Sequence, residues 1–354
     1  MNQLNIFQAL PVSLPYSEVG LLDENYEEKL NKPEKLSFSL KTPANNANGS
    51  PVIRRSLRGS PLQHFPPKST LAYSRTSDLS KSSLISPPNT DSPIIILHDL
   101  FRSQKEWQSF AADLAVLVRR RVLAVDLRNH GTSPAETSLC GLGELLADIT
   151  ALFKELKLNP ANTTLMGHGI GGWCAMIFAL LHPYKLRNII VVEANPTDNN
   201  YLRYEVLKLE DALVRVQTPA RGRSLTESKL KTSDTLKESA VITSLRAYTI
   251  ENIVVSDVVG KPERWNQKKN EIVASLKSLT KFPTFLKSYC FDKPALFVAS
   301  AASKTIKTED ESNILTLFPQ ATFLRYEKVT KNPHVELFDD FLDIVRDFLL
   351  NDNL

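Results

Sequence analysis

The sequence predicts an α/β fold: a mainly parallel sheet flanked by helices, with an inserted helical cap. Strand-sized apolar runs alternate with amphipathic helical segments over residues 93–193 and again over 295–350. Between these two stretches, residues 197–285 are polar and helix-prone, which interrupts the alternation. With 354 residues, 42% of them hydrophobic, the chain is long enough to bury a large core.

The individual elements follow from the periodicity of apolar residues. The run Pro93-Ile94-Ile95-Ile96-Leu97-His98 is continuous and β-branched at three positions, as is typical of a strand buried on both faces. It follows a short strand-like stretch at 69–74 and a polar loop at 80–91. The later elements predicted are helices over 107–118, 142–156, 173–181 and 337–350, and strands over 121–126, 163–166, 188–193, 295–298 and 321–326.

The chain divides into an N-terminal region and one folded domain. Residues 1–67 are predicted to be disordered or extended, and residues 68–354 to form the domain, with the cap at about 197–285. Residues 1–34 hold six acids and two lysines, whereas residues 35–77 hold seven basic residues and no acid. The second segment fits either a disordered polar tail or an organellar transit peptide.

Composition excludes several classes of partner. The net charge is +4, and the lysines and arginines are scattered among 39 acids rather than gathered in one basic run. This distribution argues against nucleic-acid binding. No apolar run reaches the ~20 residues of a membrane span. The three cysteines have neither zinc-ligand nor disulfide spacing, which favours a reducing, intracellular compartment. The sequence predicts no metal site and no cofactor.

A glycine-rich turn joins the strand at 163–166 to the following helix. The segment Gly167-His168-Gly169-Ile170-Gly171-Gly172 has the strand–turn–helix pattern of a nucleophile elbow, whose central residue carries the reacting side chain. That central residue is Gly169, which has no side chain. A phosphate-cradling turn is the alternative, but the G-x-G-x-x-G spacing is not met and no Gly-Lys-Ser/Thr follows.

Three segments resemble one known family. They are Ile94 to Ser103, Val125-Asp126-Leu127-Arg128-Asn129-His130-Gly131-Thr132-Ser133-Pro134, and Gly167 to Gly172. Together they resemble the α/β-hydrolase superfamily, within it the branch of alpha/beta-hydrolase domain-containing protein 11, bacterial esterases and yeast ethanol acetyltransferases. The resemblance covers roughly residues 69–350, and its Asp-x-Arg-Asn-His-Gly segment is the most specific part.

The resemblance implies positions for a catalytic triad, and two of them have lost the required side chain. The family's nucleophilic serine falls on Gly169, its acid on Glu193, and its general-base histidine on Lys331. His334 matches only a second, non-catalytic histidine. Without oxygen or sulfur at position 169 no acyl-enzyme can form, and a protonated lysine is a poor base.

The oxyanion loop is altered as well. The resemblance implies that the backbone N–H groups of Leu100 and Ile170 are the oxyanion donors. The family's His-Gly has become His98-Asp99, and a carboxylate beside those donors opposes a developing negative charge. A later glycine of the loop is Arg102.

Other reactive residue types have structural explanations. Cys174 is predicted to pack within the elbow helix, Asp126 and Arg128 to form a structural turn and ion pair, and Glu193 to pair with Lys331. His168 is expected to be structural. Three serines are expected on loops at the catalytic face: Ser103, Ser133 and Ser300.

These departures predict a non-catalytic hydrolase-fold protein, a pseudo-hydrolase that acts as a binding, regulatory or assembly subunit. It would hold a protein partner or a small acyl-like ligand. The alternative is an ester or thioester hydrolase, or an acyltransferase, using non-standard residues such as Lys331, Asp99 or a serine of the cap. The resemblance implies a mitochondrial location, and the cytoplasm is the other expectation.

Overall fold

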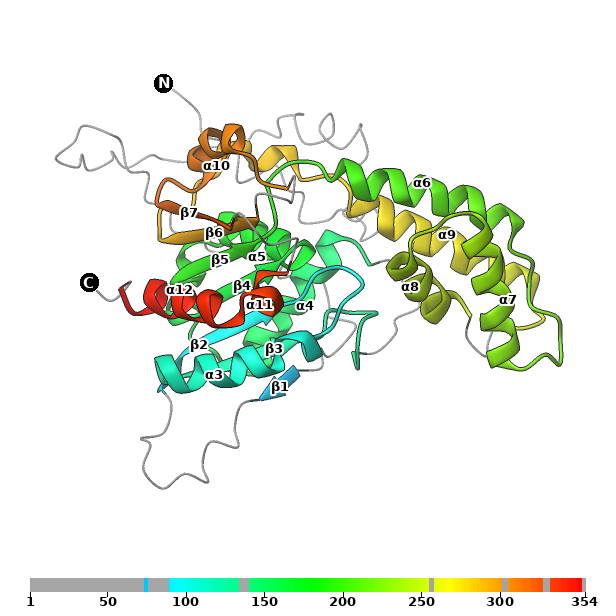
Figure 1. Cartoon of the computed structure of the whole chain (residues 1–354), viewed down its shortest axis with the longest axis horizontal. Helices are drawn as coiled ribbons and strands as arrows, with labels where there is room; N and C mark the ends of the chain where they lie inside the picture. Colours follow the sequence, from blue (N-terminus) through cyan, green and yellow to red (C-terminus); the bar gives the residue numbers. More distant parts are fainter. Residues whose placement is uncertain are drawn as a thin grey trace, which may run out of the picture.

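The computed structural model describes residues 73–75, 89–133, 140–254, 258–300, 305–326 and 332–351 (Figure 1). The predicted N-terminal region at 1–67 and the predicted base position Lys331 lie outside these described residues. No helix among them is long and apolar enough to cross a membrane.

The described strands form one seven-stranded sheet in the order β1-β3-β2-β4-β5-β6-β7. Among these described strands, β1 alone is antiparallel to its neighbour, β3, and every other pairing is parallel. The mainly parallel sheet predicted from the alternation is therefore confirmed. The strands are β1 (Tyr73–Arg75), β2 (Asn89–Leu97), β3 (Arg120–Val125), β4 (Thr164–His168), β5 (Asn188–Val192), β6 (Ala295–Ser300) and β7 (Ala321–Tyr326).

Helices cover both faces of the sheet. Helices α3 (Gln108–Val118) and α12 (Phe338–Asn351) pack together on one face. Helices α4 (Leu142–Glu155), α5 (Ile170–Leu181) and α10 (Glu311–Leu317) belong to the core on the other face. Strand β2 contributes to both cores, Ile94 and Ile96 to one and Ile95 and Leu97 to the other. Its continuous apolar run is explained by this burial on two sides.

The cap is an insertion of helices between β5 and β6. It consists of α6 (Asn200–Arg215), α7 (Leu225–Glu238), α8 (Thr243–Ile253) and α9 (Pro262–Ser278), which extend away from the sheet (Figure 1). Helix α7 occupies a stretch whose sequence has no clear apolar periodicity. Its N-terminus is fixed locally, because the Ser224 side chain accepts a hydrogen bond from Glu227 N–H at 3.1 Å.

Several predicted boundaries shift. Strand β2 begins at Asn89, inside the stretch predicted as a loop, and α5 begins at Ile170 rather than Trp173. The predicted helix at 337–350 is preceded by a separate short helix, α11 (Pro333–Glu336). Proline at the first position of α11 suits a helix start, since its missing N–H has no acceptor there.

Candidate functional site

The turn between β4 and α5 places Gly169 where a side chain has no room. Gly169 has φ 52° and ψ −115°, in the region that favours glycine. A Cβ built on it would overlap Oδ1 and Cγ of Asp99. Its neighbour Gly171 also lies tight against backbone, because a Cβ there would overlap the carbonyl oxygen of Leu97. The turn therefore needs glycine at both positions in this structure.

The carboxylate of Asp99 accepts hydrogen bonds from the two backbone N–H groups that the resemblance implies as oxyanion donors. Its Oδ1 accepts the N–H of Leu100 at 2.7 Å and the N–H of Ile170 at 2.9 Å. The side chain of Asp99 is only half-buried, while both donor residues are buried. Ile170 is the first residue of α5, so the carboxylate also lies at the positive end of the helix dipole. The resemblance places Asp99 beside these donors, and the structure adds that its carboxylate accepts both of them.

Two buried histidines fix the backbone that carries Asp99. His98 Nδ1 donates to the carbonyl of Asp99 at 2.7 Å, and His98 Nε2 accepts the N–H of Leu127 at 3.0 Å. His130 Nε2 accepts the N–H of Phe101 at 3.1 Å. Each ring accepts through one nitrogen, which requires the neutral form. Burial accordingly lowers the pKa of His98 to about 4 and that of His130 to about 3.

Glu193 follows β5 directly and is buried, at φ 51°. Its Oε1 accepts the backbone N–H of Ser300 at 2.5 Å. The carboxylate thus ties the end of β5 to the end of β6. The predicted Glu193–Lys331 pair stays a prediction, because Lys331 lies outside the described residues.

His334 is packed as an aromatic ring. It is 1% exposed and stacks on Trp107 with centroids 3.9 Å apart and ring planes 9° from parallel. The ring of His168 lies 5.3 Å away at a steep angle. Neither ring nitrogen of His334 has a hydrogen-bond partner among the described residues. Burial lowers the pKa of His334 to about 3, so this imidazole is neutral at physiological pH.

The predicted ion pair between Asp126 and Arg128 is wrong. Asp126 accepts from Gln104, through both its backbone N–H and its side-chain amide at 2.8 Å. Arg128 instead forms a buried two-point ion pair with Asp148 of α4, at 2.6 and 2.5 Å. Both residues still have structural roles, but their partners come from elements that are remote in sequence.

The remaining reactive side chains include one that is buried in the core and one that makes a structural hydrogen bond. Cys174 of α5 is fully buried, and burial raises the pKa of its thiol. Ser133 donates its hydroxyl to the carbonyl of Asp126 at 2.7 Å, and Ser103 precedes the 3-10 helix at Gln104–Trp107. Within the described ranges, no group of three or more His, Cys, Asp or Glu could hold a metal ion.

The arrangement of sheet, turn and inserted cap agrees with the comparison with protein families. Residues 92–336 match the model described as the alpha/beta hydrolase fold. The chain belongs to the α/β-hydrolase fold family. The resemblance inferred from the three motif segments is thereby confirmed.

The relatives include enzymes of the branch that the motifs indicated. Mouse sn-1-specific diacylglycerol lipase ABHD11 is 28% identical over 260 residues, which are 72% of this chain and 80% of the mouse protein. Ethanol acetyltransferase 1 of Kluyveromyces lactis is 24% identical over 302 residues, 80% of either chain. A solved marine microorganism esterase has a TM-score of 0.56 at 23% identity, covering 79% of this chain and 99% of the esterase, and supports the fold alone.

Proposed function

We propose that this α/β-hydrolase-fold chain is non-catalytic and acts by binding, as a regulatory or assembly subunit. The observation that carries the proposal is the carboxylate of Asp99 on the N–H groups of Leu100 and Ile170. In acyl transfer, two such N–H groups stabilise the oxygen that becomes negative in the transition state. Here the carboxylate of Asp99 lies where that oxygen would bind.

Displacing this carboxylate would cost more than displacing water. Hydrogen bonds to an ionised acceptor are worth about 1.5–3 kcal/mol each, and Asp99 accepts two from backbone N–H groups. A neutral ester carbonyl is a weaker acceptor than a carboxylate. A substrate entering the site would therefore find the donors already satisfied and would meet a like charge when its own oxyanion developed.

The other triad positions support the same conclusion. Gly169 offers no nucleophile, and the space for one is filled by the Asp99 carboxyl group. Glu193 directs a carboxylate oxygen to the N–H of Ser300. A lysine at the base position, Lys331, would be protonated near neutral pH unless it is strongly desolvated. The nucleophile and base positions thus carry groups with different chemistry, and the carboxylate kept at the acid position, Glu193, accepts a backbone N–H.

The proposed partner is a second protein or a small acyl-like ligand that lies beside the filled donors. The proposed location is intracellular, either the mitochondrion or the cytoplasm. Relatives named as lipase, esterase and acetyltransferase show that the branch includes enzymes, so the loss of catalysis would be particular to this chain.

One observation favours the alternative, an ester or thioester hydrolase or acyltransferase with non-standard residues. The Asp99 carboxyl group lies where a nucleophilic side chain at 169 would lie, and carboxylates act as nucleophiles in some hydrolases. However, Oδ1 already accepts both N–H groups, so the donors that should stabilise a product oxyanion are bound to the attacking carboxylate itself.

Labelling with a fluorophosphonate probe and hydrolysis of p-nitrophenyl acetate would test the proposal. We expect the wild-type protein to show neither labelling nor turnover above a boiled sample. Stoichiometric labelling of the wild type would overturn the proposal, and the labelled peptide would identify the nucleophile.

Two matched variants make the expected negative result informative. The triple variant Asp99→Gly, Gly169→Ser, Lys331→His restores the family's side chains at three of the altered positions, and we expect it to react with the probe. The same variant with Gly169→Ala has the opened site but no hydroxyl, and it should not react. If only the serine variant is labelled, the pocket can support reaction with the probe, and the native side chains at these positions are what prevent it.

A further inference from the structure

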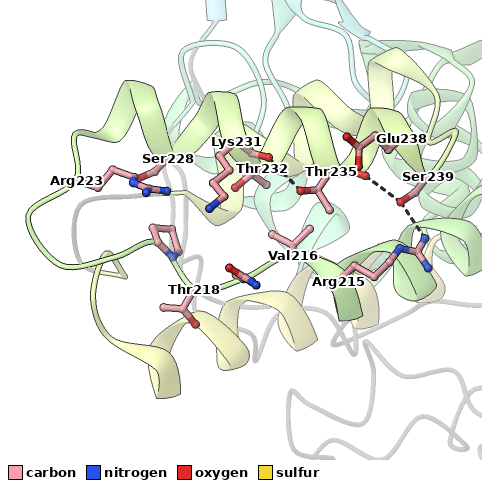
Figure 2. Close-up of a pocket in the computed structure, with 12 residues that line it drawn as sticks. Arg215, Val216, Thr218, Arg223, Ser228, Lys231, Thr232, Thr235, Glu238 and Ser239 are labelled. Atoms are coloured by element: carbon pink, nitrogen blue, oxygen red, sulfur yellow. Dashed lines mark hydrogen bonds between the residues drawn. The ribbon is translucent and has the colours of Figure 1, made fainter.

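A polar cleft lies inside the cap, between the end of α6 and the inner face of α7 (Figure 2). Its volume is about 460 Å³, within the range of small-molecule sites. Helix α7 lies at the end of the cap far from the sheet, so this cap cleft is separate from the Gly169 turn (Figure 1). It is lined by residues 215–219, Arg223, and the side of α7 that includes Ser228, Lys231, Thr232, Thr235, Glu238 and Ser239.

The charges of the cap cleft are mainly positive. Arg215, Arg223 and Lys231 line it, against one acid, Glu238. Arg215 is bound to Asp211 at 3.1 Å and to the hydroxyl of Ser239 at 2.9 Å. At the other end, Arg223 is paired with Glu227 through its Nε, and Lys231 is the lining cation with no acid partner among the described residues.

At that other end, several hydrogen-bond donors have no partner among the residues that the structure describes. Lys231 points into the space between α7 and the segment carrying Val216 and Thr218 (Figure 2), and its Nζ contacts no acid among the described residues. Within the described part of the chain, Arg223 contacts an acid through its Nε, toward Glu227 at 3.1 Å, and its terminal nitrogens contact none.

Two hydroxyls extend the same set of donors. The side chains of Thr232 and Thr218 line the cleft, and neither makes a hydrogen bond with another described residue. Thr232 is 3% exposed, so the small part of its surface that remains open faces a confined space. Lys231, Arg223 and these two hydroxyls together present more hydrogen-bond donors than the two oxygens of a carboxylate can accept.

We propose that the cap cleft binds a phosphate monoester of a small organic molecule. A phosphate group carries about −1.5 to −2 charges at neutral pH and three acceptor oxygens, which matches two cations and two hydroxyls. The volume exceeds that of phosphate alone, which leaves room for the organic part. Glu238, at the Arg215 end, is an acceptor for a hydroxyl or amine of that part. The proposal does not depend on whether the Gly169 turn is catalytic.

Calorimetric titration of the full chain with ribose 5-phosphate would test the site. Ribose is the matched neutral control, and inorganic phosphate and sulfate measure what the anion alone contributes. We expect saturable binding of ribose 5-phosphate, weaker binding of inorganic phosphate, and none of ribose. Equal binding of phosphate and sulfate with no gain from the sugar would reduce the site to a nonspecific anion patch and overturn the proposal.

Substitutions on one helix locate the binding. Lys231→Gln and Arg223→Gln should each weaken ribose 5-phosphate binding at least tenfold. Lys237→Gln, on α7 but outside the cleft lining, should leave the affinity unchanged. An equal loss in the Lys237 variant would mean that net charge, and not the cap cleft, attracts the ligand. Far-ultraviolet circular dichroism of each variant would establish that the helix is intact.

Discussion

The Gly169 turn and the cap cleft both present hydrogen-bond donors, but the donors at the turn are already bound, whereas several of those in the cleft have no partner among the described residues. At the turn, Asp99 of the loop after β2 accepts the N–H groups of Leu100 and Ile170. In the cap cleft, Lys231 and Thr232 line an open space and contact no acceptor of the described chain through their side chains. The first region is closed by the protein's own carboxylate, whereas the second is left for a ligand.

This difference shows that the geometry of a fold and the chemistry of its site can change independently within one chain. The sheet domain keeps the packing and the strand–turn–helix geometry of its family, including two glycines that permit the tight turn. A fold can keep its geometry while the chemistry of its site is replaced, since function depends on particular side chains. The cap, which carries the polar cleft, is then the part of the molecule where binding should be sought.

The largest expected contrast between the two regions is their response to acid. In the sheet domain, burial lowers the pKa of His98 to about 4 and of His130, His182 and His334 to about 3. In the unfolded chain these groups would titrate near 6.5, so below that pH the unfolded state binds more protons and stability falls. Each contributes about 1.4 kcal/mol per pH unit between 6.5 and its folded pKa.

One group acts in the opposite direction. Burial raises the pKa of Glu144 to about 7, so its contribution to stability grows as the pH falls from 7 toward 4.5 and cancels about one histidine. The net expectation is a loss on the order of several kcal/mol between pH 7 and pH 5. Urea unfolding at the two pH values would measure it. An unchanged midpoint, or imidazole proton resonances that titrate near 6.5, would contradict the neutral histidines.

Ion pairs provide the next contrast. Asp148→Asn would leave the buried guanidinium of Arg128 without its charge partner, which should lower the free energy of unfolding by about 3–5 kcal/mol. Glu210→Gln removes the exposed partner of Lys277 in the cap, and the loss should be below about 1 kcal/mol. Denaturant unfolding of both variants would compare them directly. Similar losses would mean that the buried pair is not what anchors α4 to the loop after β3.

The contact between Gly169 and Asp99 should be visible as an energetic coupling. Gly169→Ala places a methyl group into the Asp99 carboxyl group at a positive φ, and we expect a loss of about 2–4 kcal/mol. Adding Asp99→Gly should recover part of that loss, because it empties the space. The control is Asp99→Asn with Gly169→Ala, which keeps the volume and should recover nothing. Additive losses in all combinations would show that the two side-chain positions do not compete for space.

A feature could be predicted from the sequence when it depends on residues that are close together in the chain, and not when it depends on contacts between remote segments. The buried strands β2 and β5 were predictable because each contains a continuous apolar run, residues 94–97 and 189–192. The partner of Arg128 was not, because the neighbouring Asp126 is the nearest acid in sequence while Asp148 approaches only when α4 packs.

The site follows the same rule. That Gly169 lacks a nucleophile is evident from one residue. That Asp99 reaches Ile170, 71 residues away, depends on how closely the loop after β2 meets the start of α5. Its only sequence signal is an acid where the resembling family has glycine. The predicted cap at about 197–285 includes α7, but the bounds of this helix were not predicted because its apolar face is narrow, with Leu236 as its fully buried apolar side chain among the described residues.

A small effect at a helix cap tests whether α7 is held independently of the sheet domain. Ser224→Ala removes the acceptor for Glu227 N–H and should cost about 1 kcal/mol, whereas Ser224→Asp keeps a capping acceptor and should cost little. Because Ser224 lies next to Arg223, fraying there should also weaken phosphate binding in the cap cleft. Hydrogen exchange would then increase in the first turn of α7 and remain unchanged at Ile170, where Asp99 accepts the N–H. Faster exchange at Ile170 as well would show that the two regions open together, and the contrast between a closed turn and an open cleft would no longer describe two independent parts.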